Sequence, residues 1–230
     1  MAIVAIFDQQ AGRPAAGLAA TLALLSASTR TTLLWDMTPQ GCAATMLSPD
    51  LTRTPARLLL ARGADVARLS SAAGDGRPAL LWADLALSGA ARLVHAAVGD
   101  VRLSRLGDAV AAADGCSFLF CSDASAAPAL SLAARADALI LPILPSPESA
   151  LRVGAAMARV GAAGAAILPA HVGVNRRDPD HRDALERHSD WPILPAAPEG
   201  APAPFPPRSP ARAAAQLLLD RIERRLARAG

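Results

Sequence analysis

The sequence predicts an α/β fold in which a mainly parallel sheet of about seven strands carries helices on both faces. Short apolar runs alternate with alanine-rich stretches, most of these runs are apolar at every position, and aromatic residues make up only 3% of the chain. Strands that are apolar throughout are typical of parallel sheets covered on both sides. A length of 230 residues fits one core, so we expect residues 1–230 to form a single domain.

Seven segments have the length and composition of strands: Ala2–Phe7, Thr31–Trp35, Ala79–Trp82, Ser117–Cys121, Ala138–Leu144, Ala165–Leu168 and Trp191–Leu194. Parallel strands need long crossover connections, which are usually helices. The helices expected between them are Ala15–Ser28, Pro55–Arg62, Val101–Ala113, Ala126–Arg135, Ser146–Val160 and Pro179–His188. In such a sheet a ligand lies at the carboxyl ends of the strands.

The end of the chain predicts a proline-rich connector over residues 200–210 and a helix over residues 210–228. Ser209 suits the N-cap and Pro210 the first helical position. An apolar stripe is expected to dock this helix on the sheet, and it comprises Leu217, Leu218, Ile222 and Leu226.

Composition favours a cytoplasmic protein. The longest apolar runs, such as Ala138–Leu144, are interrupted by proline well before the ~20 residues that a membrane span requires. The three cysteines, Cys42, Cys116 and Cys121, form no CxxC pair, and their odd number fits a reducing compartment better than a disulfide framework. The four histidines have no clear metal-ligand spacing, so no metal site is expected.

Four segments, in this order along the chain, carry a resemblance to a known family. The loop from Gln9 to Gly17 takes the place of a KGGxGKTT motif, and Asp36–Gly41 (DMTPQG) matches DxDPQG. Leu80–Ala90 is similar to a strand that leads into an LAGAE-like segment, and Ala134–Pro142 (ARADALILP) is similar to an AADxxIIP strand. The chain thereby resembles the ParA/MinD family of deviant-Walker P-loop ATPases, which implies a three-layer P-loop NTPase-like sandwich.

In this alignment the loop has lost the groups that hold a phosphate. Gln10 stands at the position of the lysine that crosses the family's dimer, Ala15 at the Walker lysine and Ala16 at the magnesium-binding hydroxyl. Pro14 removes a backbone N–H, and the chain contains no lysine at all. The vestigial nucleotide loop is Gln9, Gln10, Gly12, Arg13, Pro14, Ala15, Ala16 and Gly17. Since each charged hydrogen bond contributes ~1.5–3 kcal/mol, we expect no cofactor, with weakly bound Mg-ATP as the alternative.

For several other residues of the altered pocket the sequence allows two interpretations. By the resemblance this pocket also includes Asp36, Thr38, Cys121, Asp123, Asn175 and Arg176. Asp36 keeps the first carboxylate of the DxD pair and either faces the catalytic water or shapes its turn. Asp123 lies two residues late for a metal ligand and also suits a turn cap. The pair Asn175-Arg176 resembles an adenine contact but also precedes a helix start.

The leading hypothesis is a catalytically inactive ParA/MinD-like protein that acts as a binding or scaffolding subunit in a bacterial positioning, partition or envelope-export assembly. Its partner would be a protein, either a second copy or an active relative. The alternative is a divergent ATPase that uses Arg13 and Asp36, dimerises with ATP and binds DNA or membrane. A small-substrate synthetase-like enzyme of the same fold is the third hypothesis, but the sequence offers no convincing general base.

Arginines gather near the C-terminus, where they either contact DNA or lipid or form the solvated face of the last helix. They are Arg212, Arg221, Arg224, Arg225 and Arg228.

Overall fold

The computed structural model describes part of the chain. The described residues are 2–8, 13–38, 41–48, 54–55, 76–82, 115–122, 136–144, 166–174, 178–179, 181, 183, 186, 192–195 and 204–229.

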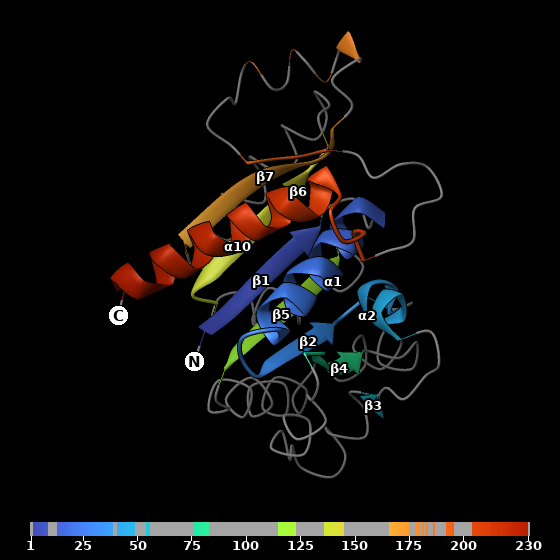
Figure 1. Cartoon of the computed structure of the whole chain (residues 1–230), viewed down its shortest axis with the longest axis vertical. Helices are drawn as coiled ribbons and strands as arrows, with labels where there is room; N and C mark the ends of the chain where they lie inside the picture. Colours follow the sequence, from blue (N-terminus) through green and yellow to red (C-terminus); the bar gives the residue numbers. More distant parts are fainter. Residues whose placement is uncertain are drawn as a thin grey trace, which may run out of the picture.

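An eight-stranded sheet forms the centre of the molecule, in the order β3-β4-β2-β5-β1-β6-β7-β8 (Figure 1). All of its described pairings are parallel. The strands are β1 Ala2–Asp8, β2 Thr32–Asp36, β3 Thr54–Pro55, β4 Ala79–Trp82, β5 Cys116–Ser122, β6 Ala138–Ile143, β7 Ala166–Val174 and β8 Ile193–Pro195. The predicted α/β class and parallel sheet are confirmed.

The strand count is close to the predicted count of about seven, and the structure differs from the prediction at Pro55 and at the end of β7. The sheet has an eighth strand, β3, and Pro55 belongs to it rather than to a helix. Two residues are too few to form an apolar pattern, so this strand could not be recognised from the sequence. Strand β7 continues past Leu168 to Val174, although Pro169 has no N–H to donate to a neighbouring strand.

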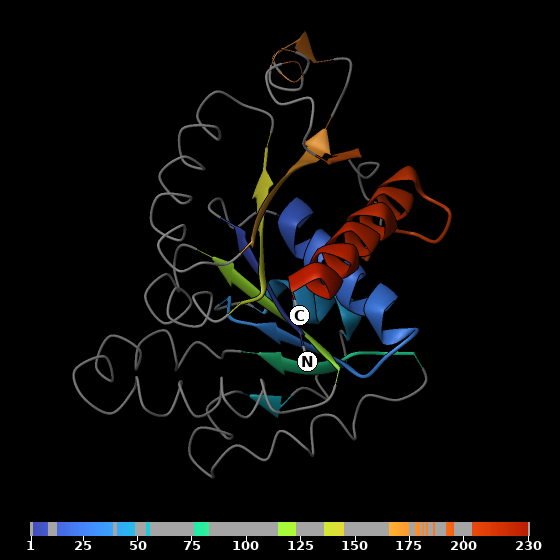
Figure 2. The ribbon, with the colours of Figure 1, turned by 90° about the vertical axis from the view of Figure 1, so that its left-hand side faces the viewer.

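Three helices are described in full: α1 Arg13–Ala27, α2 Cys42–Leu47 and α10 Pro210–Ala229. Helices α1 and α10 lie side by side on one face of the sheet (Figure 2). Their apolar side chains join those of alternate strand residues, such as Ile6 and Phe118, in one core cluster that also includes Ala43 of α2. Phe7, Trp35 and Leu119, which point to the opposite face, are equally buried. Both faces of the sheet are therefore covered.

Of the other predicted helices, some coincide with described residues and some lie outside them. The helix expected over residues 15–28 is α1, which begins two residues earlier. Helical residues at 179, 181, 183 and 186 agree with the helix expected over residues 179–188. Residues 56–62, 101–113, 126–135 and 146–160 lie outside the described part. Helix α2 was not predicted, because six residues are too short for a periodic pattern.

Helix α10 begins as the sequence predicts. The Ser209 hydroxyl accepts a hydrogen bond from the Arg212 main-chain N–H at 3.1 Å, which is the N-cap contact. The predicted apolar stripe is wrong at Leu217, whose side chain is 68% exposed. Adjacent helical positions point about 100° apart, so Leu217 and Leu218 cannot both face the core. The buried face consists of Ala211, Ala215, Leu218, Leu219 and Ile222.

The described end of the proline-rich connector packs against α1 rather than only crossing the surface. Phe205 is buried, and its main-chain N–H donates to the Thr21 hydroxyl at 3.0 Å. Its carbonyl accepts a 3.4 Å hydrogen bond from Arg212 Nη1. The connector therefore holds the start of α10 against the middle of α1.

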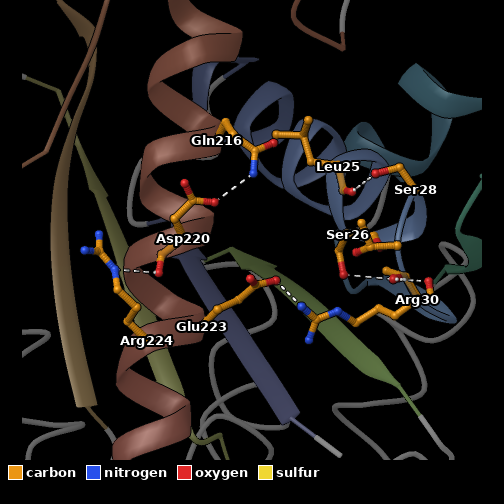
Figure 3. Close-up of polar contacts among 10 residues, drawn as sticks. Leu25, Ser26, Ser28, Arg30, Gln216, Asp220, Glu223 and Arg224 are labelled. Carbon is orange, nitrogen blue, oxygen red and sulfur yellow. Dashed lines mark hydrogen bonds and ion pairs between the residues drawn. The ribbon is translucent and has the colours of Figure 1, made fainter.

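Polar contacts also join α10 to the turn that follows α1 (Figure 3). Glu223 of α10 forms an ion pair with Arg30 of this turn. The hydroxyls of Ser26, in the last turn of α1, and Thr32, at the start of β2, are 2.9 Å apart and form a hydrogen bond across this turn. The connector thus holds the start of α10 to the middle of α1, and the ion pair holds the second half of α10 to the turn after α1.

None of the helices in the described part combines the length and the hydropathy that a membrane span needs.

Candidate functional site at the carboxyl edge of the sheet

The carboxyl ends of β1, β2 and β5 lie together in the middle of the sheet, where a parallel α/β fold places its ligand. Strand β5 pairs with both of the others, so Asp8 at the end of β1 is opposite Ser122, and Asp36 at the end of β2 is opposite Phe120. Helix α1 begins at Arg13, shortly after β1 ends. The predicted nucleotide loop therefore does lead from the central strand into a helix, as a P-loop does.

The two alanines at the positions of the Walker lysine and the magnesium-binding hydroxyl are core residues. Ala15 is 2% and Ala16 is 1% exposed, and both belong to the main apolar cluster. Pro14, in the first turn of α1, needs no hydrogen-bond partner there because N–H groups in a first turn have none within the helix. At these positions the start of α1 is thus built as packing surface.

Gly17 allows Phe205 to approach α1 closely. A Cβ atom at position 17 would lie 3.1 Å from Cε1 of the Phe205 ring, which is closer than ordinary van der Waals contact. Gly173, near the end of β7, has φ +66°, and a Cβ there would lie 3.6 Å from Cγ of Pro14. The aromatic ring and the strand end therefore both pack on the first turns of α1.

Asp36 is fully buried, and both of its oxygens accept hydrogen bonds from the chain that follows it. Oδ1 accepts from the Thr38 N–H at 2.9 Å and from the Thr38 hydroxyl at 2.6 Å. Oδ2 accepts from the main-chain N–H groups of Ala43 at 2.6 Å and Ala44 at 2.9 Å. Asp36 thereby caps α2, which is the contact that the turn-shaping interpretation requires.

Thr38 completes this turn. Its hydroxyl donates to Asp36 and accepts a hydrogen bond from the Cys42 N–H at 3.0 Å, while Gly41 takes φ +60° just before the helix. Burial raises the pKa of the Asp36 carboxyl, and the four hydrogen bonds that it accepts act in the opposite direction. Asp36, Thr38 and the first turn of α2 are therefore joined in one hydrogen-bonded unit.

Cys121 occupies the end of β5, where the resemblance places an acidic residue in the family. Its side chain is buried, and its Sγ lies 3.9 Å from Sδ of Met37. Burial raises the pKa of the Cys121 thiol to about 12, with the Asp36 charge adding to the effect. Since a thiol binds metals as the thiolate, this one is a packing residue at neutral pH.

Sequence reasoning passed over Asp8, which the structure places at this edge with only 3% of its surface exposed. The available signal was a carboxylate that ends an otherwise apolar strand. The side chain of Arg13 lies outside the described part, as do the whole residues Gln9, Gln10, Gly12, Asp123, Asn175 and Arg176. In the described part no cluster of three His, Cys, Asp or Glu side chains could hold a metal ion.

These residues fit a nucleotide only in part. The first turn of α1 offers main-chain N–H groups, and the N-terminus of a helix favours a phosphate. The described side chains at this edge, Asp8, Ala15, Ala16, Asp36 and Cys121, bring no positive charge to it, and the Asp36 oxygens are already occupied. Main-chain contact with a phosphate is thus supported, whereas side-chain neutralisation of a triphosphate is not.

Solved structures share this fold over nearly the whole chain. Cobyrinic acid a,c-diamide synthase from Mycobacterium smegmatis, with bound ADP and magnesium, is 23% identical with a TM-score of 0.70, covering 97% of this chain and 94% of that one. A plasmid partition protein from Borrelia burgdorferi is 14% identical with a TM-score of 0.72, covering 97% and 98%. McdA from Cyanothece is 17% identical with a TM-score of 0.66, covering 99% and 97%.

No family model and no curated protein matches the sequence. Identities below 25% show the fold alone, and the class that they define is the P-loop NTPase-like α/β sandwich. The fold inferred from the ParA/MinD resemblance is therefore confirmed.

The expectation that no cofactor belongs here is contradicted by the same structures. The synthase was crystallised with ADP and magnesium and also with an ATP analogue and magnesium. A putative plasmid partition protein from Borrelia burgdorferi B31, 13% identical with a TM-score of 0.72, was solved with AMPPNP. That expectation rested on lost side chains, whereas a P-loop also holds phosphates through main-chain N–H groups, which a sequence does not display.

Proposed function

We propose that the protein is a catalytically inactive ParA/MinD-like protein that serves as a binding or scaffolding subunit in a bacterial positioning, partition or envelope-export assembly. The observation that carries this proposal is the hydrogen-bonded unit around Asp36. Its carboxylate, the one acidic group of the DxD pair that the sequence retains, is fully buried and accepts four hydrogen bonds from its own turn. Orienting a water molecule or a metal ion would require breaking these bonds.

The start of α1 supports the same proposal. Catalysis of phosphoryl transfer depends on positioning and on neutralising charge around the γ-phosphate. Ala15 and Ala16 supply neither, and both side chains are packed in the core. A function that depends on surface contacts does not need these groups.

Adenine nucleotide with magnesium is the ligand class that we assign to this edge. The synthase was crystallised with ADP and magnesium, and the putative partition protein from Borrelia burgdorferi B31 with the analogue AMPPNP. Main-chain N–H groups at the start of α1 would hold its phosphates. Bound in this way the nucleotide would stabilise the fold or a surface, and it would not be hydrolysed.

Phosphate release from Mg-ATP tests the proposal. The wild-type protein and the Arg13→Ala variant should both release phosphate at the rate of a buffer blank, under multiple-turnover and single-turnover conditions. Arg77→Ala, a substitution of an exposed arginine just before β4, is the matched control. Calorimetry with Mg-ADP in parallel measures binding separately from hydrolysis.

Turnover that Arg13→Ala abolishes and Arg77→Ala leaves intact would refute the inactive assignment. It would establish the divergent ATPase instead, with Arg13 in place of the missing lysine.

A further inference from the structure

The outward face of α10 carries four side chains in one line: Leu217, Arg221, Arg224 and Arg228. Intervals of four, three and four residues keep them on one side of a helix, and they span about 16 Å along its axis. All four are exposed, and Leu217 is the only large hydrophobic residue in the described part that is exposed. We call these four residues the α10 outer stripe.

The stripe is separate from the face that holds α10 in the fold. Leu218, Leu219 and Ile222 pack in the core, on the opposite side of the helix. Arg212, which was considered with the other arginines as a DNA or lipid contact, instead has Nη1 hydrogen-bonded to the Phe205 carbonyl. The outer stripe therefore has no evident role in docking the helix.

The acidic residues of α10 do not form ion pairs with Arg224 or Arg228. Glu223 points toward α1 and pairs with Arg30, whereas Arg224 lies on the other side of the helix (Figure 3). The Asp220 carboxylate accepts from Gln216 Nε2 at 2.8 Å, and Arg224 Nε donates to the Asp220 main-chain carbonyl at 3.2 Å. Among the described residues, Arg224 and Arg228 have no carboxylate within ion-pair distance.

Favourable interaction with the helix dipole does not account for the whole stripe. That effect falls off within the last turn, which contains Arg228, whereas Arg221 lies about two turns before the end of the helix. Arginine also differs from lysine in presenting a planar fork that pairs with carboxylates through two hydrogen bonds. A surface complementary to the stripe would therefore carry carboxylates opposite the guanidinium groups and an apolar group opposite Leu217.

We propose that the α10 outer stripe docks an acidic amphipathic helix of a partner protein. Intervals of four, three and four residues are those of the seam between two paired helices. Glutamate or aspartate on the partner's seam would face the three arginines, and an aliphatic residue at one end would cover Leu217.

Other occupants fit less well. A second copy of the same helix would set arginine against arginine. A membrane helix needs a broad apolar face, and that of α10 is already buried. Nucleic acid leaves Leu217 without an apolar partner. The inference rests on the proposed function only for the existence of a protein partner.

Fluorescence anisotropy with the intact protein tests the proposal. The probe is a fluorescein-labelled helical peptide of about 20 residues, with leucine and glutamate in the 4-3-4 spacing on an alanine-glutamine background. The same peptide in scrambled order, a duplex DNA of similar length and vesicles that contain phosphatidylglycerol are the comparison ligands. At about 50 mM salt we expect the ordered peptide to bind more tightly than all three comparison ligands. At about 300 mM salt we expect the ordered peptide to bind less tightly than it does at about 50 mM, because salt screens the charges.

Substitutions distinguish binding by the α10 outer stripe from a general effect of the protein's positive charge. Arg224→Glu and Arg228→Glu should each weaken binding of the peptide by about tenfold. Leu217→Ala should weaken it about threefold, because an aliphatic contact is lost. Arg77→Glu, the same reversal of charge at an exposed site near β4, should leave it unchanged. All four positions are exposed, so the folds should remain intact.

Failure of the ordered peptide to bind would overturn the proposal. So would equal binding of the scrambled peptide, an equal loss in Arg77→Glu, or tighter binding of duplex DNA or vesicles that depends on Arg224 and Arg228. Measured ATP turnover would refute the inactive assignment without affecting these results, so the two proposals fail separately.

Discussion

The turn between β2 and α2 and the outer stripe of α10 both present charged side chains, but in opposite settings. Asp36 is fully buried, and four donors from its own turn surround it. Arg224 and Arg228 are exposed and have no carboxylate partner in the described part of the chain. Water solvates the arginines at little cost, whereas a buried carboxylate without donors would be very unfavourable. The buried charge therefore serves the fold, and the exposed charges remain available to a partner.

Replacement of Asp36 by alanine should give the largest effect. It would leave the N–H groups of Thr38, Ala43 and Ala44 without their acceptor inside the protein, so we expect the free energy of unfolding to fall by about 3–5 kcal/mol. Urea denaturation followed by circular dichroism measures this.

Asp137→Ala is the matched control, because this exposed carboxylate accepts a single hydrogen bond, from the Ile3 N–H at 2.8 Å. We expect it to cost about 1 kcal/mol. If Asp36→Ala cost no more than the control, the carboxylate would be free for a catalytic role and the contrast between the two regions would disappear.

Ala15→Lys should have an intermediate effect. It restores the residue that the family has in its loop, but Ala15 is only 2% exposed and lies in the core cluster, so the ammonium group must be buried or the helix displaced. We expect a loss of about 2–3 kcal/mol and no gain in phosphate release.

Ala213→Lys makes the same change on the exposed side of α10 and should alter stability by less than about 0.5 kcal/mol. Phosphate release in the Ala15→Lys variant, without loss of stability, would show that position 15 still faces a nucleotide.

Glu223→Gln should have the smallest effect. Its ion pair with Arg30 joins α10 to the turn after α1, but the two side chains are 37% and 36% exposed, so solvent screens the attraction. We expect a loss of about 0.5 kcal/mol or less by urea denaturation. A loss above about 1.5 kcal/mol would mean that exposed charges on α10 hold the fold together, which would weaken the case for a stripe kept for a partner.

Much of the sheet follows from sequence because most positions of its strands are apolar. The segment Ala138–Ile143, buried throughout, is an example. Short elements escaped prediction: β3 has two residues and α2 six, and neither length displays a periodic pattern. On α10 the sequence marked the N-cap correctly and placed Leu217 on the wrong face, since an alanine-rich helix leaves several rotations equally plausible.

The sequence by itself determined the parallel α/β class, the place of the vestigial nucleotide loop directly after the first strand, and the absence of lysine and hydroxyl from that loop. Only the tertiary structure decided that Ala15 and Ala16 face the core, that Asp36 caps α2, that β1 lies at the centre of the sheet, and that Arg224 and Arg228 have no carboxylate partner among the described residues. Residue types and their spacing are local properties that sequence displays. Burial and hydrogen-bond partners depend on which segments meet in space, and these decide whether a charge is used within the fold or offered to a partner.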